Sequence, residues 1–221
     1  MAMWSTPPDR VSGVWRAYRH TDKRFQPLWY GAGTTSLRQE SGRWHQEGAG
    51  VAQYLALSTN GAWAERCRYA SIRDDVRRVS ETRCLWELQV QEHDIADLGS
   101  FDKHAACGLA PELAAGPHTT SWALADGLRA AGYRGILSPA AAYDQPRAVN
   151  LTLFGERIEN HQYGAMPDPA DNPRPDMFIP AILITDAGTP TQHAMHHTCY
   201  QNAYHQTFAA WCRANDYTPA P

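Results

Sequence analysis

The sequence lacks the cysteine arrangements of disulfide-rich and zinc-binding proteins. Its five cysteines are odd in number and far apart, and no two of them form a CxxC pair. A scattered, odd set of this kind is typical of reduced thiols in a cytosolic protein rather than of a disulfide framework. We therefore expect free thiols and a cytoplasmic location, although a folded protein delivered to another cell as an effector would have the same pattern.

Long apolar runs and dense basic patches are also missing. No stretch approaches the roughly 20 apolar residues that cross a bilayer, and the opening MAMWSTPPDR has no apolar run of signal-peptide length. The 20 lysines and arginines are outnumbered by 23 acidic residues, which gives a net charge of −3. Such a charge provides no general attraction to nucleic acid. We expect neither a membrane nor a nucleic acid to be a partner.

Several catalytic motifs are absent as well. There is no GxSxG elbow, no P-loop and no HExxH pair, and the GAG at 31–33 lacks the helix pattern of a dinucleotide fingerprint. A cluster near the C-terminus has the density of a metal site but no nearby carboxylate; it consists of His193, His196, His197, Cys199 and His205. We expect no metal site there.

Apolar residues make up 43% of the 221 residues, which is enough for one large domain with an extension. Alternating patterns predict strands at 11–19, 51–57, 82–91, 133–138, 148–154 and 178–185. Helical spacing predicts helices at 60–73, 119–132 and 198–215. The candidate caps are Ser58, Thr59 or Asn60 for the first and Thr119, Thr120 or Ser121 for the second, which Gly132 is placed to end. A short connector is expected at 94–98 and an irregular, partly helical segment at 105–117. We expect a domain at 1–163 and a Pro-rich linker with a strand-plus-helix extension at 164–221, packed on the same domain.

The stretch 41–65 contains the most suggestive polar residues. Arg43 lies in a glycine-framed loop, Tyr54 in the following strand and Glu65 in the next helix. If these elements fold back on each other, a cation, an aromatic face and a carboxylate meet in one cleft. That set suits a substrate with phosphates, a flat ring and a bond that breaks with developing positive charge. Two plainer interpretations stay open: Glu65 as a solvated helix charge, and Arg16 of the first strand as an edge arginine in water rather than a phosphate ligand.

The order of these pieces resembles the RES domain family. The matching segments are VWRAYR with Arg16, GRW with Arg43, YLA with Tyr54, the helix glutamate Glu65, and the later GIL and NLTLF strands. The resemblance implies a toxin of a bacterial toxin–antitoxin pair that degrades NAD or transfers ADP-ribose. It implies an α+β, ADP-ribosyltransferase-like fold of two small packed sheets flanked by helices, with an NAD cleft between them. NAD⁺ would be the substrate, and the protein partner an Xre-type antitoxin or an immunity protein.

Carried over by position, the resemblance assigns Arg16 and Arg43 to the pyrophosphate, Tyr54 to the nicotinamide or ribose face and Glu65 to the oxocarbenium-like charge. The family serine is the departure, because the turn reads SPAAA at 138–142 and a strict alignment places Ala140 at the serine position. Ser138 lies two residues earlier, on the same face of a strand, and we expect it to replace the family serine as a catalytic residue that orients the diphosphate or ribose. The alternative is that this hydroxyl is missing. We expect an NAD⁺ glycohydrolase or phosphorylase. The alternatives are a protein-modifying ADP-ribosyltransferase and, because of this mismatch, a catalytically inactive RES-like binding module.

Overall fold

In a computed structural model of the protein, the described residues are 3–22, 28, 39–72, 83–115, 117–140, 148–155, 157–160, 164–167 and 179–186. Their strands are β1 (Arg10–Asp22), β2 (Ala52–Ala56), β3 (Arg83–Asp97), β4 (Gly135–Pro139), β5 (Val149–Phe154), β6 (Arg157–Asn160), β7 (Gly164–Pro167) and β8 (Ile179–Asp186). Their helices are α1 (Thr59–Ile72), α2 (Phe101–Ala106), α3 (Glu112–Ala115) and α4 (Thr119–Ala130). The expected mixed class of strands and helices is confirmed.

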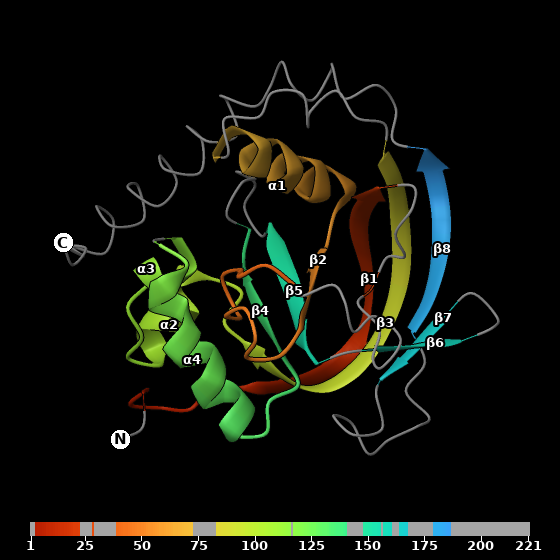
Figure 1. Ribbon diagram of the computed structural model, residues 1–221. Helices are drawn as coiled ribbons and strands as arrows, with labels where there is room; N and C mark the ends of the chain where they lie inside the picture. The colour runs from red at the N-terminus through yellow and green to blue at the C-terminus, as the bar shows by residue number, and fades with distance from the viewer. Residues whose placement is uncertain are drawn as a thin grey trace.

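These strands form one sheet in the order β1-β2-β5-β4-β3-β8-β7-β6, and a further pairing of β1 with β3 closes the first five into a barrel. The expectation of two separate packed sheets is therefore corrected to a closed barrel with a three-strand extension (Figure 1). Closure depends on the length of β3, which pairs with β1 along one edge and with β8 and then β4 along the other. Closing a sheet on itself removes its unpaired edges.

The connector expected at 94–98 is instead the end of β3. Ile95, Ala96 and Asp97 pair in parallel with β4, and the same segment pairs with the start of β1. A register shift between Val11 and Gly13 marks a bulge, and Asp94 adopts a positive φ of 54° there. A bulge bends and twists a strand, so polar residues that appeared to end β3 lie at a bend within it.

Two apolar clusters lie on the two faces of the barrel wall. Inside the barrel are alternate residues of the strands, including Leu55, Leu137 and Leu151. Outside, residues of opposite parity such as Ile136 and Phe154 pack against Leu124 of α4. The strict two-residue period of a strand assigns each side chain to one face. The helices α2–α4 cover one part of the barrel and α1 covers another (Figure 1).

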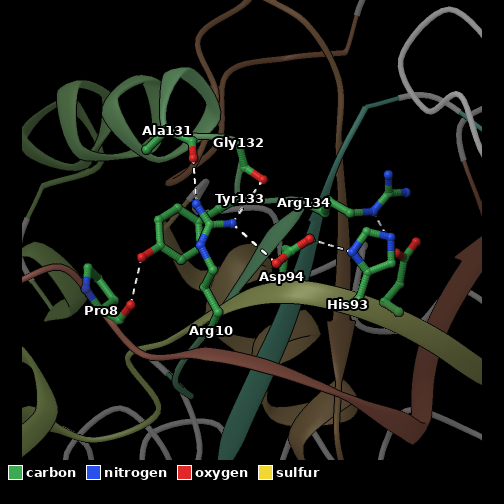
Figure 2. A network of polar contacts seen from close by, with 9 residues as sticks. Pro8, Arg10, His93, Asp94, Ala131, Gly132, Tyr133 and Arg134 are labelled. Carbon is green, nitrogen blue, oxygen red and sulfur yellow. Dashed lines mark hydrogen bonds and ion pairs between the residues drawn. The ribbon is translucent and has the colours of Figure 1, made fainter.

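Polar contacts fix the point where β1, β3 and the end of α4 meet (Figure 2). Arg10 donates to the carbonyls of Ala131, at 2.5 Å, and Gly132, at 3.2 Å, and forms an ion pair with Asp94 at 3.3 Å. Its guanidinium also lies 4.0 Å from the ring centroid of Tyr133. Gly132 ends α4 with a φ of 81°, as its position in the sequence predicted.

The caps of the helices follow the sequence in part. Ser58 accepts a hydrogen bond from the backbone N–H of Gly61 at 3.0 Å and so caps α1 as predicted. In α4 the expected caps do not act as such, because Thr120 donates to the carbonyl of Pro117 and Ser121 donates to that of Leu113. These hydroxyls therefore connect α4 to the segment before it.

Other expectations concern the chain after residue 163. The predicted strand at 178–185 is confirmed as β8, which pairs with β3. The helix at 198–215 and the histidine cluster at 193–205 lie outside the described residues, and the division at residue 163 stays a prediction. In the described part of the chain, no helix combines the length and the apolar character that a bilayer span requires.

Candidate functional site

One row of side chains crosses four strands on the outer face of the barrel. Tyr18 of β1 is opposite Ala56 of β2, Ala56 is opposite Asn150 of β5, and Asn150 is opposite Ser138 of β4. Directly opposed residues have Cβ atoms about 4.5–5.5 Å apart. The row therefore places an amide and a hydroxyl side by side, and Ser138 is almost fully buried at 3% exposure.

Helix α1 brings Glu65 to this row. Ala62 of α1 packs in one small cluster with Ala56 and Tyr18. From there the Glu65 carboxylate reaches across to β5, where the side-chain amide of Asn150 donates to Oε1 at 2.9 Å. Glu65 lies beyond the first turn of α1, so the helix dipole, which acts within that turn, contributes little to it. Its position is set by the sheet contact rather than by the helix end.

Tyr54 occupies the next row, opposite Thr152 of β5. Its hydroxyl oxygen accepts a hydrogen bond from the backbone N–H of Trp44 at 2.8 Å and lies 2.9 Å from Nδ1 of His45. Burial raises the pKa of Tyr54 and lowers that of His45. Both rings are therefore neutral near pH 7, and the tautomer of His45 determines which of the two donates. The hydroxyl of Tyr54 is fixed by the loop, and its ring packs against the outer apolar cluster.

The loop that contacts Tyr54 is itself held from several sides. Gly42 approaches so closely that a Cβ there would lie 2.5 Å from the Tyr54 hydroxyl oxygen. The indole N–H of Trp122 donates to the Gly42 carbonyl at 2.8 Å. Arg129 donates to the Trp44 carbonyl at 2.7 Å. Residues from α4 thus determine where the GRW segment lies against β2.

The two predicted arginines have different environments. Arg43 is buried, with 7% exposure, donates to the carbonyl of Leu113 at 3.3 Å, and lies close enough to Tyr54 to oppose the rise in its pKa. Arg16 is exposed on the outer face of β1, opposite Gln89 of β3 and two residues from Tyr18. Ser138 and Tyr54 thus lie on adjacent rows and Glu65 contacts the row of Ser138 through Asn150, with Arg16 on the same face and Arg43 in the adjoining loop.

The match to a known family shows to which proteins this chain is related. The model of the RES domain matches residues 13–171. The chain belongs to the RES domain family. No curated protein matches it. Among solved structures it is similar to "Crystal structure of the M.tuberculosis MbcT-MbcA toxin-antitoxin complex", at 18% identity and a TM-score of 0.60, over 86% of this chain and 92% of that chain. At this identity the likeness concerns the fold.

The geometry also bears on which position in this RES domain corresponds to the family serine. Ser138 pairs directly with Asn150, the residue that contacts Glu65. Ala140, the residue at the strictly aligned position, is buried one step beyond the last paired residue of β4. A hydroxyl at 138 is thus next to the Glu65 contact.

Sequence reasoning missed two residues of this RES domain site. Asn150 was treated only as part of the NLTLF strand, and His45 only as part of the loop after GRW. The signal for Asn150 was the two-residue period of its strand. Leu151 and Leu153 face the interior of the barrel, so Asn150 has to be a polar residue on the opposite, outer face. Nothing local indicated the contact of His45 with Tyr54, because strand β2 returns to the loop only in the folded protein.

Proposed function

We propose that this RES domain is an NAD⁺-consuming toxin that cleaves the bond between nicotinamide and ribose. The observation that carries the proposal is the Glu65 carboxylate, held against the sheet by Asn150 with Ser138 as its cross-strand neighbour. A carboxylate fixed at one spot is suited to stabilising the positive charge that develops on a ribose ring as its glycosidic bond breaks. Membership of the RES family supports the same conclusion.

The proposed reaction assigns a part to each group. The bonding electron pair of the ribose C1′–nitrogen bond leaves with nicotinamide, while Glu65 faces the developing cation. Water or inorganic phosphate then bonds to C1′, which gives ADP-ribose with release of a proton, or its phosphate ester. Arg16 and Arg43 bind the pyrophosphate through charge-assisted hydrogen bonds, the ring of Tyr54 lines the ribose or nicotinamide side, and Ser138 orients the ribose or the diphosphate.

The proposal extends to fold and partner. We propose an ADP-ribosyltransferase-like arrangement of the elements with an NAD cleft. We also propose that the protein is bacterial and cytoplasmic and that a second chain controls it. The similar solved structure is a toxin–antitoxin complex, which supports an antitoxin as the partner here. We propose an Xre-type antitoxin, and a secreted effector with an immunity protein would be the other outcome of a search for the partner.

The test is release of nicotinamide from NAD⁺ by the purified chain, with and without phosphate. We expect Glu65→Gln to lower the rate about 100-fold, the loss typical of one preorganised electrostatic group. Glu47→Gln is the matched control, because Glu47 is exposed in the loop after GRW and has the same chemistry. Equal rates for the two variants would contradict the assignment of Glu65.

A second readout separates the alternative activities. NAD⁺ labelled in the adenosine part is incubated with a cell lysate and the protein. Label that appears on a protein would show ADP-ribosyl transfer, whereas label that remains in small molecules would show hydrolysis or phosphorolysis. Binding of NAD⁺ without release of nicotinamide would identify a binding module and overturn the proposed activity.

A further inference from the structure

Asn150 is the polar group in the best position to act with Glu65. It lies near the start of β5, half-buried, between the small side chains of Ala56 and Ser138 in the cross-strand row. Small neighbours on both sides leave the carboxamide as the longest polar group between them. Its Nδ2 donates to Glu65 at 2.9 Å.

The orientation of this amide follows from chemistry. An ionised carboxylate only accepts hydrogen bonds, so the NH₂ group of Asn150 must face Glu65 and the carbonyl oxygen must face away. That oxygen, Oδ1, is buried and has no hydrogen-bond partner among the described residues. A buried carbonyl without a donor costs free energy. Thr152, two residues along the same face, has a buried hydroxyl in the same condition within the described part of the chain.

We propose that Asn150 is a positioning residue of this site, whose Nδ2 holds the Glu65 carboxylate where the ribose charge develops. This inference rests on the proposed function and assigns a residue to it. The amide occupies this position although its buried Oδ1 has no partner among the described residues, and orientation of Glu65 offsets that cost. The rigid contact fixes the carboxylate relative to β5 before the substrate binds.

The experiment compares two variants at two pH values. Asn150→Ala removes the contact with Glu65, and we expect kcat/KM for nicotinamide release to fall about 100-fold at either pH. Asn150→Asp is isosteric with the amide, and while its carboxyl is protonated the acid O–H donates to Glu65 as the amide does. Above the pH at which the pair loses its shared proton, two carboxylates face each other and repel.

We therefore expect Asn150→Asp to stay within about tenfold of the parent at about pH 5 and to lose at least a further tenfold by about pH 8. Gln91→Glu is the matched control, because it adds the same charge at an exposed position of β3 opposite Val14. That control should follow the pH profile of the parent. The other described titratable residues on the outer face of β1 and β2 and on α1 are unchanged in all variants; they include Arg16, Tyr18, His20, Tyr54, Glu65 and Arg66.

The outcomes separate the two proposals. If the parent releases nicotinamide and Asn150→Ala does so with the same kcat and KM, this inference is overturned while the proposed function stands. If Asn150→Asp and Gln91→Glu share one pH profile, the contact with Glu65 plays no part in the reaction. If the parent releases no nicotinamide, the proposed function itself fails. A misfolded variant cannot mimic the expected result, since activity of Asn150→Asp at acid pH requires an intact site.

Discussion

Replacement of Gly42 by alanine should disturb the site through Tyr54. The new Cβ would lie 2.5 Å from the Tyr54 hydroxyl oxygen, 2.9 Å from Cζ and 3.1 Å from Cε1 of His45. To reach ordinary contact distance the phenol ring has to move by about 1 Å, at a cost of about 1–3 kcal/mol for overpacking. That movement also weakens the hydrogen bonds that the Tyr54 hydroxyl makes with Trp44 and His45, which contribute about 1 kcal/mol each. We expect a loss of about 3 kcal/mol in the free energy of unfolding.

The assay is thermal unfolding followed by circular dichroism. For a chain of this size, 1 kcal/mol corresponds to about 2–4 °C, so Gly42→Ala should lower Tm by about 6–12 °C. Gly13→Ala is the matched control, because a Cβ at Gly13 meets only the Trp15 ring at 3.5 Å, an ordinary contact. In a Tyr54→Phe background the oxygen at 2.5 Å is gone, so Gly42→Ala should cost about 1 kcal/mol less. A Tm shift no larger than that of Gly13→Ala would refute the reasoning.

Three further predictions concern stability away from the site. Burial lowers the pKa of His104 from 6.5 to about 4, so between these pH values the unfolded chain binds a proton that the folded chain does not. The free energy of unfolding should therefore fall by about 3 kcal/mol as the pH decreases through that window. Urea unfolding at several pH values should show a smaller pH dependence for His104→Gln. Gly127→Ala in α4 places a methyl 3.5 Å from Trp4, an ordinary contact, and the gain in helix propensity of about 1 kcal/mol should raise Tm by about 2–4 °C. An unchanged or lower Tm would contradict this prediction. Arg134→Met removes an ion-pair partner of the buried Glu92, whose carboxylate lies 2.9 Å from Nε of Arg134. A urea titration should show a loss of about 3 kcal/mol in the free energy of unfolding. An unchanged midpoint would mean that this ion pair does not stabilise the fold.

The local elements were predictable because they follow from periodicity and caps. The alternation of Leu151 and Leu153 with polar neighbours predicted both the strand and its inward face, and Gly132 predicted the end of α4. Closure of the barrel was not predictable. It depends on the pairing of β1 with β3, whose partners such as Arg16 and Gln89 are far apart in the chain, and no local pattern specifies that register.

The same distinction applies to the candidate site. The resemblance to RES domains identified Glu65 and Tyr54, and the structure places Tyr54 in the row next to the one that Glu65 contacts through Asn150. The burial of Arg43 could not be foreseen, because its hydrogen bond to Leu113 comes from a segment 70 positions later in the chain. The sequence pattern of GRW indicated a functional loop, but the contacts that hold that loop belong to α3, α4 and the segments beside them.

The described apolar contact between α1 and the row that contains Asn150 consists of two alanines and one tyrosine. Ala62 of α1 packs with Ala56 of that row and with Tyr18 beside it. The contact of Glu65 with β5 therefore depends on how closely Ala62 and Ala56 approach each other. A branched residue at either alanine would act as a wedge that tilts the carboxylate away from the sheet while every strand kept its pairing, so such a chain would be folded yet lack the arrangement on which the chemistry depends.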